Sequence, residues 1–305
     1  MRNILKSTTF LAILSCWLWS TAFAGVKIGL QYNTPFQFAG IRFFVAGFIL
    51  FIFLGHPRRY ISEIKNSARF ILIIALVQVF VQYALFYSGM NIVPGALGAM
   101  IIGSSPLFIA IVAHFSFHND RLSPLKVASI LIGVAGIVVI TLGRASTISM
   151  GGFTELTGIF LLLINNLVSG YSNVLIAKSK HLVSPIVLSS SSLMIGGLLL
   201  FLISLPLEGL NTGPFPTKYY LALGWLSFLS AAAITIWYGL LQRPGVKVSI
   251  LNTWKFLIPV SGAILSWLLI KEEKPDVISF AGMAIIAISL LLLNYANRKI
   301  SKNTR

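Results

Sequence analysis

Residues 94–117 read PGALGAMIIGSSPLFIAIVAHFSF, an apolar run that contains no Asp, Glu, Lys or Arg. A helix needs about 20 mainly apolar residues to cross the hydrocarbon core of a bilayer, because each residue adds only ~1.5 Å of length. This run is long enough to cross. It predicts a membrane-spanning helix that begins at Pro94, where the missing N–H of proline removes no helical hydrogen bond.

Nine further apolar runs of similar length lie on either side of this one. Backbone amides in lipid must be bonded within their own segment, so these runs are expected to be helices. The sequence therefore predicts an all-α membrane protein with ten transmembrane helices. The predicted spans are residues 7–27, 35–55, 69–91, 94–117, 124–143, 155–177, 185–206, 219–242, 245–270 and 276–296.

The composition of the whole chain agrees with a lipid surrounding. Of its 305 residues, 57% are hydrophobic and only 10% are charged, whereas a soluble domain has about 25% charged residues. The net charge of +16 would suggest a nucleic-acid partner in a soluble protein. Here the basic residues form short clusters between the apolar runs, as at Arg58-Arg59 and Arg298-Lys299, so we expect the bilayer, and no nucleic acid, as the partner.

The same clusters predict the orientation of the chain. Most of the 23 Lys and Arg residues fall in segments that lie on one side if both termini are cytoplasmic. Cytoplasmic loops carry an excess of Lys and Arg. We therefore expect a multi-pass protein of the inner (plasma) membrane with the N- and C-termini in the cytoplasm.

An internal repeat is the most informative feature of the sequence. Residues that determine backbone geometry match in order between the two halves at an offset of about 150 residues. The matched pairs are Pro35 and Pro185, Gly47 and Gly197, Gly89 and Gly239, Pro94 and Pro244, Gly95 and Gly245, Pro106 and Pro259, and Asp120 and Glu273. We therefore expect residues 1–148 and 149–305 to be two five-helix repeats, and Pro94 and Pro244 to begin helices 4 and 9.

An odd number of spans in each repeat makes the second copy run upside down in the membrane. Two such halves can adopt similar conformations that open to opposite sides, with a ligand site at their interface. This geometry favours a transporter that works by alternating access. It also requires the first apolar run as a helix, although Ala22-Phe23-Ala24-Gly25 at its end resembles a signal-peptide cleavage site. We expect that run to stay uncleaved.

The chain resembles the EamA-type drug/metabolite transporter superfamily over nearly its whole length. The resemblance rests on the run from Leu257 to Gly262 that leads to Glu272-Glu273, on Leu107 through Asp120, on Gly133 and Gly136, and on Arg42-Phe43. Asp120 and Ser129 stand where the family more usually has Glu and Gly. The resemblance implies that helices 1–4 and 6–9 enclose a central cavity and that helices 5 and 10 pack outside, with Ser129 and Gly133 in a packing seam.

Two basic residues within the predicted spans are the first candidates for a substrate site. Lys255 lies near the middle of helix 9, and Arg42 lies closer to the outer end of helix 2. Ionisable residues inside a membrane are usually functional and face a cavity or a partner. Every acidic residue falls in a loop or at the end of a span. A substrate anion could therefore be the counter-ion of Lys255, or burial could leave the amine uncharged.

Polar and aromatic residues at helical spacing extend this candidate site. Amides in lipid need partners, so their faces are expected to point into the bundle, either to line the cavity or to bond neighbouring helices. Aromatic residues deep in the spans could shape a pocket or pack the core. The substrate-binding candidates besides Lys255 and Arg42 are Asn252, Trp254, Asn165, Ser169, Asn173, Gln78, Gln82, Tyr83, Trp17 and Trp237.

Pro106 and Pro259 are predicted to interrupt helices 4 and 9, either as gating hinges or as fixed bends.

We expect a secondary transporter that exports a small polar metabolite. The metabolite would be an amino acid or a related compound, and it could be anionic. An anion-selective metabolite or phosphate-ester exchanger is the alternative. A membrane enzyme and a non-transporting scaffold are the competing classes. Enzymes of this kind need paired carboxylates or a base and a nucleophile. The predicted spans contain no paired carboxylates, and the sequence has no phosphate-binding loop and no HExxH motif. We expect no cofactor and no metal, and a monomer or homodimer.

Overall fold

The structure is a computed structural model that describes residues 7–54, 57–117, 120–145, 152–179 and 182–303. Within these residues the ordered elements are helices joined by short connections. Nine helices are long and apolar enough to cross a membrane, and a tenth apolar helix, Pro124–Ile140, is shorter within this part of the chain. The prediction of an all-α membrane protein is confirmed.

The first half contains five spans, three of which are composite. The first span is α1 (Thr8–Ser20) followed by α2 (Ala22–Leu30), and the second is α3 (Pro35–Phe53). The third consists of α4 (Pro57–Ile74), the π-helix η1 (Ala75–Val81) and α5 (Gln82–Ile92). The fourth is α6 (Gly95–Gly103) and α7 (Ser105–Ser116), and the fifth is α8 (Pro124–Ala145).

The second half repeats this order with fewer interruptions. It contains α9 (Gly152–Lys178), α10 (Pro185–Glu208) and α11 (Thr217–Leu241). The ninth span is α12 (Val248–Asn252), the 3-10 helix η2 (Thr253–Phe256) and α13 (Leu257–Leu269), and α14 (Val277–Asn303) is the last helix. The predicted boundary between residues 148 and 149 lies outside the described residues.

The start of the ninth span differs from the prediction. Pro94 is the N-cap of α6, as expected, but Pro244 does not begin a helix. Gly245 has a φ of +76°, in the left-handed region that favours glycine, and the chain turns there. The ninth span therefore begins at Val248.

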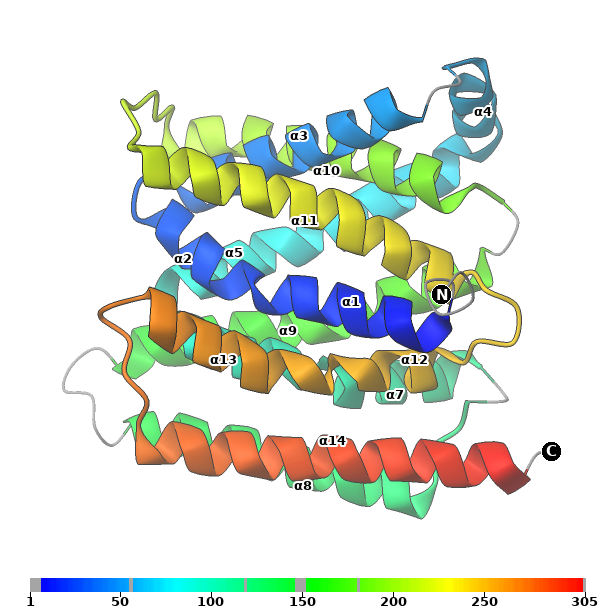
Figure 1. The fold of residues 1–305 in the computed structure, drawn as a ribbon, viewed down its shortest axis with the longest axis vertical. Helices are drawn as coiled ribbons and strands as arrows, with labels where there is room; N and C mark the ends of the chain where they lie inside the picture. The colour runs from blue at the N-terminus through cyan, green and yellow to red at the C-terminus, as the bar shows by residue number, and fades with distance from the viewer. Residues whose placement is uncertain (1–6, 55–56, 118–119, 146–151, 180–181, 304–305) are drawn as a thin grey trace.

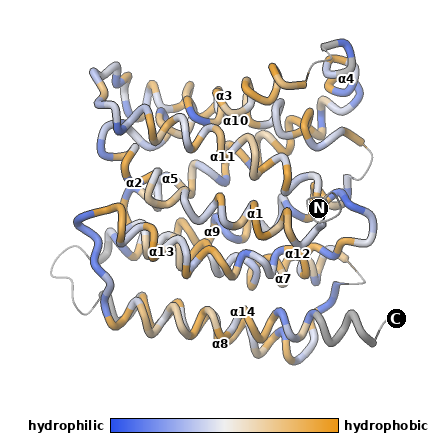
Figure 2. Tube along the Cα trace, viewed as in Figure 1, coloured by the Kyte–Doolittle hydropathy of each residue, from blue (hydrophilic) through white to orange (hydrophobic). Residues whose placement is uncertain are grey.

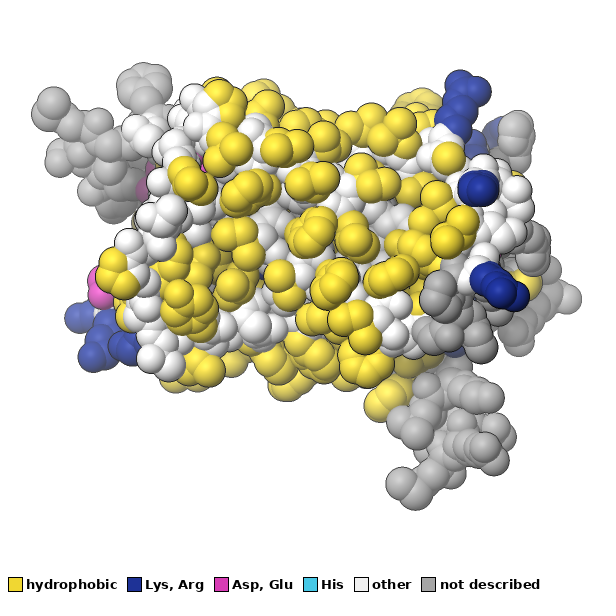
Figure 3. Space-filling model, turned by 90° about the horizontal axis from the view of Figure 1, so that it is seen from above, with side chains coloured by type: hydrophobic (Ala, Val, Ile, Leu, Met, Phe, Trp, Pro, Cys, Tyr) yellow, Lys and Arg dark blue, Asp and Glu magenta, His cyan; other side chains and the backbone are white. Residues whose placement is uncertain are grey.

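The surface of the bundle matches a lipid environment. Figure 2 shows hydrophobic residues along the lengths of the helices and hydrophilic ones in many of the connections. Large apolar side chains project outward from the middle of the helices, for example Leu131 and Phe160. The face in Figure 3 is an apolar belt with Lys and Arg side chains at both ends. The described part of the chain thus presents apolar side chains where acyl chains would lie.

Helices of the first half pack mainly against helices of the second half. The pairs in contact are α3 with α10, α8 with α14, α6 with α13, α5 with α9, and α1 with α11 (Figure 1). A two-fold relation between the halves would produce this set of pairs. The inverted repeat itself stays a prediction.

Glycines allow the closest of these contacts. A Cβ on Gly47 would lie 2.6 Å from the Ser190 carbonyl oxygen of α10, and one on Gly197 would lie 2.5 Å from the Phe44 nitrogen of α3. In the α8–α14 pair, the Ser289 hydroxyl donates to the Ser129 carbonyl at 2.8 Å, and a Cβ on Gly133 would meet the same hydroxyl at 2.6 Å. Ser129 and Gly133 therefore do lie in a seam between two helices.

The beginning of α1 and the end of α14 lie at the same end of the bundle (Figure 1). We call this the terminal end, and the opposite one the far end.

Candidate functional site

A cavity of about 90 Å³ lies in the middle of the bundle. Among the residues that the structure describes, those from seven of the ten spans line it, and the spans α8, α10 and α14 contribute none. The absence of α8 and α14 agrees with the expected arrangement, whereas α10, the seventh span, was expected to enclose the cavity. It packs instead against α3 and η1, and its Ser190 hydroxyl donates to the Gly47 carbonyl of α3 at 2.7 Å.

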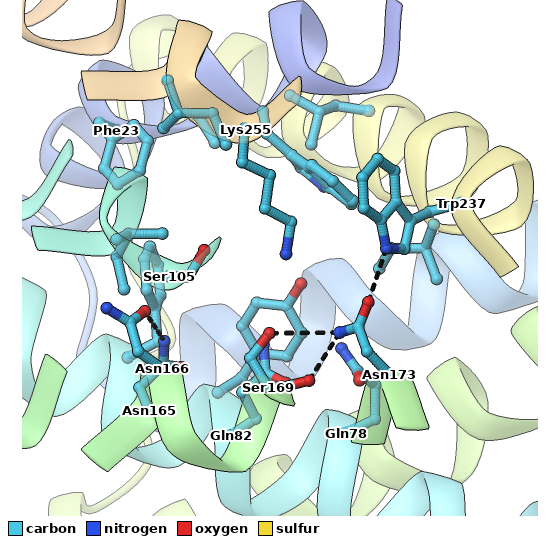
Figure 4. A pocket seen from close by; sticks show the side chains of 18 of the residues that line it. Phe23, Gln78, Gln82, Ser105, Asn165, Asn166, Ser169, Asn173, Trp237 and Lys255 are labelled. Atoms are coloured by element: carbon cyan, nitrogen blue, oxygen red, sulfur yellow. Dashed lines mark hydrogen bonds between the residues drawn. The ribbon is translucent and has the colours of Figure 1, made fainter. Parts of the chain in front are cut away.

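Lys255 extends from the wall formed by η2 into this cavity (Figure 4). Its side chain is buried. Its ammonium nitrogen lies 5.5 Å from the ring centre of Trp19 and 5.2 Å from that of Trp237, within the range of cation–π attraction. Within the described residues it makes no hydrogen bond or ion pair, and no lining residue is acidic. The amine therefore presents unused donors to whatever occupies the cavity.

Arg42 is a second buried cation in the lining, carried by α3. Its guanidinium lies 4.2 Å from the ring centre of Phe43 and 5.4 Å from that of Tyr87. One nitrogen, Nη2, donates to the Ser230 hydroxyl at 3.1 Å. The Nε and Nη1 atoms are buried and have no partner in the described part of the chain. Aromatic rings thus hold the charge in place while two donors stay unsatisfied.

A row of polar residues on α9 forms another wall. Asn165, Ser169 and Asn173 all line the cavity, at the four-residue spacing that the sequence showed. The Asn173 side-chain oxygen accepts from the Trp237 indole nitrogen at 2.9 Å, and its amide nitrogen donates to the Ser169 carbonyl at 2.6 Å (Figure 4). The Asn165 side-chain oxygen is buried and has no hydrogen-bond partner among the described residues. The wall therefore combines fixed and unsatisfied polar groups.

The third span supplies polar and aromatic groups to the same cavity. Gln78 comes from the π-helix η1, and Gln82 and Tyr83 come from the start of α5. The Gln82 side-chain oxygen accepts from the Ser172 hydroxyl of α9 at 3.4 Å, and the Gln78 side-chain oxygen has no partner among the described residues. π-Helical segments are often found at functional sites.

Two of the interrupted spans that border the cavity, one in each half, contain a predicted hinge proline. The helix breaks at Ser104, between α6 and α7, two residues before Pro106, and η2 replaces the α-helix directly before α13, which carries Pro259. Asn166 of α9 donates to the Ile101 carbonyl at the first break, at 2.8 Å. Ser105, which follows the first break, and Lys255, which lies in η2 at the second, both line the cavity.

Three of the candidate residues do not line the cavity. Trp17 is 53% exposed on the outside of α1, because it lies on the opposite face from Trp19, which does line the cavity. Trp254 lies beside Phe256, with 6.2 Å between the ring centres. Asn252 is fully buried behind the wall, where its amide nitrogen donates to the Asn173 side-chain oxygen at 3.4 Å. The structure therefore does not place Trp17 and Trp254 at the site.

Several lining residues were not among the candidates. They are mostly single aromatic or small polar residues without a repeated spacing: Trp19, Phe23, Phe86, Ser105, Asn166 and Tyr238. Trp19 could not be distinguished from Trp17, because the apolar run around them gives no sign of which helix face is turned toward lipid. For Asn166, its direct neighbour Asn165 fitted the polar face better. Charge and helical spacing identified the other polar residues that line the cavity.

The arrangement can bind a small polar molecule through cations, amides and aromatic rings. As far as the structure describes the chain, the lining offers two cations and no carboxylate, so it favours a ligand with an anionic group. Within the described residues no group of three or more His, Cys, Asp or Glu could hold a metal.

Comparisons with known proteins agree with this architecture. The sequence profile of the EamA-like transporter family matches residues 6–142 and 156–295. The uncharacterised transporter YvbV of Bacillus subtilis is 26% identical, covering 96% of this chain and 94% of its own. A protein of Escherichia coli named as a probable amino-acid metabolite efflux pump is 24% identical, covering 92% of this chain and 93% of its own.

A solved crystal structure shares the fold. Its TM-score is 0.71 at 20% sequence identity, and the match covers 96% of this chain and 99% of that chain. Together with the match of the family profile over most of the sequence, these likenesses identify a membrane transporter and not an enzyme. The chain belongs to the EamA-like transporter family.

Proposed function

We propose that this protein is a secondary transporter that moves a small polar metabolite with an anionic group, an amino acid or a related compound, across the inner (plasma) membrane. The observation that carries the proposal is the pair of buried cations, Lys255 and Arg42, in a lining that has no carboxylate among the described residues. A charge buried in a membrane protein is costly unless it has a partner. A substrate carboxylate would provide that partner.

Export is the proposed direction. It is supported by two relatives, from Escherichia coli and Salmonella typhimurium, that are named as probable amino-acid metabolite efflux pumps. Both are 24% identical to this chain, so the substrate named for them is a starting point for this protein. The proposed orientation, with both termini in the cytoplasm, makes the terminal end the cytoplasmic one.

Alternating access is the proposed mechanism. The cavity lies between helices of the two halves, and two of the composite spans that border it, α6–α7 and η2–α13, have a break close to a proline. Pro106 and Pro259 would be the hinges at these breaks. If Pro259→Ala left the turnover number unchanged, the bend would be a fixed one and no hinge.

An anion-selective exchanger is the second candidate. It differs from the first only in its coupling, because a carrier that must hold an anion to change conformation exchanges one anion for another. The same two cations favour it.

Transport by the purified protein in proteoliposomes tests the proposal. Vesicles loaded with a panel of labelled amino acids, organic acids and phosphate esters would be diluted into buffer with and without external substrate. We expect efflux of at least one anionic or zwitterionic compound, and its acceleration by external substrate would indicate exchange. Absence of any flux that exceeds that of empty vesicles, from protein that is correctly folded, would contradict the proposal.

A further inference from the structure

Four carboxylates at the ends of the spans bind the beginnings of helices in the other half of the molecule. They are Glu208 at the start of α3, Glu273 at the start of α6, Glu63 at the start of α10 and Asp120 at the start of the ninth span. We call these contacts the cross-half caps. They use four of the seven acidic residues of the chain.

Glu273 forms the first cap at the far end. Its two carboxylate oxygens accept from the Gly95 and Ala96 amides at 2.5 and 2.9 Å, and from the Ser266 hydroxyl at 2.8 Å. A Cβ on Gly95 would lie only 2.4 Å from that hydroxyl, so the cap needs glycine there. Beside it, Lys27 donates to two carbonyls at the end of the third span, both at 3.0 Å.

Glu208 forms the second cap at the far end. Its carboxylate accepts from the Phe36 amide at 3.0 Å and from the Gln37 amide at 3.2 Å, at the first turn of α3. The Gln37 side chain donates to the Asn211 carbonyl at 2.7 Å and accepts from the Asn211 amide at 3.0 Å. This end of α10 is thus joined to α3 by charged and neutral hydrogen bonds.

Asp120 forms the matching cap at the terminal end. It accepts from the Ser249 amide at 3.0 Å and from the Ser249 hydroxyl, and it pairs with Lys126 at 3.2 Å. Asp120 is 4% exposed and Ser249 is 1% exposed, so water does not compete for the contact.

Glu63 forms the second cap at the terminal end, where it accepts from the Ser184 amide at 2.8 Å and from the Ser184 hydroxyl at 2.6 Å.

The caps are strong but breakable contacts. The first amides of a helix have no partner within the helix, and the aligned peptide dipoles attract a negative charge there. The contact is lost when the two segments separate, because water can then satisfy both sides. Each cap joins a helix of one half to a segment of the other, so relative movement of the halves must break it.

Three of the four capped spans also carry residues of the substrate site. Arg42 lies on α3, Ile102 on α6 and Lys255 in the ninth span, and all three line the cavity. A cap at the end of such a helix therefore holds that end of the bundle together and also holds a lining residue in position.

We propose that the cross-half caps are the latches of the two gates. Those of Glu273 and Glu208 close the far end, and those of Asp120 and Glu63 close the terminal end. The inference rests on the alternating access proposed above. Opening to one side releases the two latches of that side while the other two hold. All four latches are formed in the described structure.

One-sided thiol labelling tests the latches. Cys16 is the only cysteine of the chain, so Cys16→Ser provides a cysteine-free background for one reporter, Ser105→Cys, in the cavity. A membrane-impermeant thiol reagent would be added to one side of the membrane at a time. We expect Glu273→Gln to increase the labelling rate about tenfold from the far side only, and Asp120→Asn to do so from the terminal side only.

Asp276→Asn is the matched control. Asp276 also carries a carboxylate at the far end, but it caps Ser279 of its own helix α14, at 2.8 Å to the amide. We expect no change in labelling from either side. A rise for both latch variants from both sides would indicate general loosening and would overturn the inference, as would the absence of any rise.

Two further measurements keep the test decisive. Ser249→Ala removes one donor of the Asp120 latch without changing the charge, and it should shift labelling in the same direction as Asp120→Asn by a smaller factor. Monodisperse elution of each variant establishes that it is folded. Labelling needs no substrate, so failure of the latches and failure of transport in proteoliposomes are separate results.

Discussion

At the scale of single residues, Lys255 is the position where the chain departs most from what lipid tolerates. An ammonium in the middle of a span costs about 2.5–3.5 kcal/mol on insertion scales. The two tryptophan rings beside it return part of that cost, since a desolvated cation–π contact contributes up to about 2 kcal/mol. No acidic side chain among the described lining residues completes the compensation.

Replacing this amine should separate binding from folding. We expect Lys255→Met to abolish transport of anionic compounds while raising or preserving thermal stability, because an isosteric apolar chain removes the buried charge. Lys271→Met, which removes an exposed charge at the far end, is the control and should transport normally. Flux in proteoliposomes and the unfolding temperature are the measurements. Unaltered anion transport by Lys255→Met would disprove its role as the anchor.

The sequence identified the charged and regularly spaced part of the cavity but not the rest. Lys255, Arg42 and the polar face of α9 were recognisable because charge and amides are rare in lipid-facing runs. Trp17 and Trp19 could not be told apart, because the run around them is apolar on every side and does not show which helix face points into the bundle. The structure decides in favour of Trp19.

At the scale of elements, the contact between the two interrupted spans is the tightest feature near the cavity. A Cβ on Gly103, at the end of α6, would lie 2.2 Å from Cδ and 2.7 Å from the nitrogen of Pro259 in α13. Both atoms belong to a rigid ring, so they cannot move aside as a flexible side chain could. The two breaks thus meet each other.

This contact predicts the effect of one added methyl group. We expect Gly103→Ala to lower stability by about 1–3 kcal/mol through overpacking. Gly224→Ala is the matched control, because a Cβ there meets nothing within 4 Å, and alanine is the better helix former by about 0.5–1 kcal/mol. Thermal unfolding of both variants in one detergent measures the difference. Equal stability of the two would show that the helices separate easily at this point.

The presence of the membrane-spanning helices could be predicted from the sequence, but most of the breaks within them could not. Length and hydrophobicity predicted all of the spans because they follow from bilayer thickness. The π-helix η1 and the start of the ninth span at Val248 depend on contacts with other helices and on the turn at Gly245. Such tertiary effects leave no periodic pattern in the sequence.

At the scale of the whole molecule, the two halves are predicted to be inverted copies. The pairing of α3 with α10 and of α8 with α14 agrees with this prediction, and so does the finding that the matched Asp120 and Glu273 cap each other's half. Both contacts join residues that are far apart in the sequence. The sequence showed only that Asp120 and Glu273 hold matching positions in the two halves, and it could not show which residues they contact.

Reporter fusions test the topology that the inverted repeat requires. We expect an enzyme reporter that is active only in the cytoplasm to be active when fused to residue 1 and when fused to residue 305. Fusions in the loops after α3 and after α7 should be active as well, and those after α2 and after α5 should be inactive. Opposite locations of the two termini would leave an odd number of crossings and rule out two five-helix halves.

The chain has 23 Lys and Arg residues and only seven Asp and Glu residues, so its net charge is +16. Lys and Arg side chains stand at both rims of the apolar belt (Figure 3). Such a field concentrates dissolved anions near each mouth of the protein and loses that influence beyond about 10 Å at 0.1 M salt. The entrances of the bundle are therefore electropositive, and the encounter rate with an anionic solute is expected to be sensitive to ionic strength.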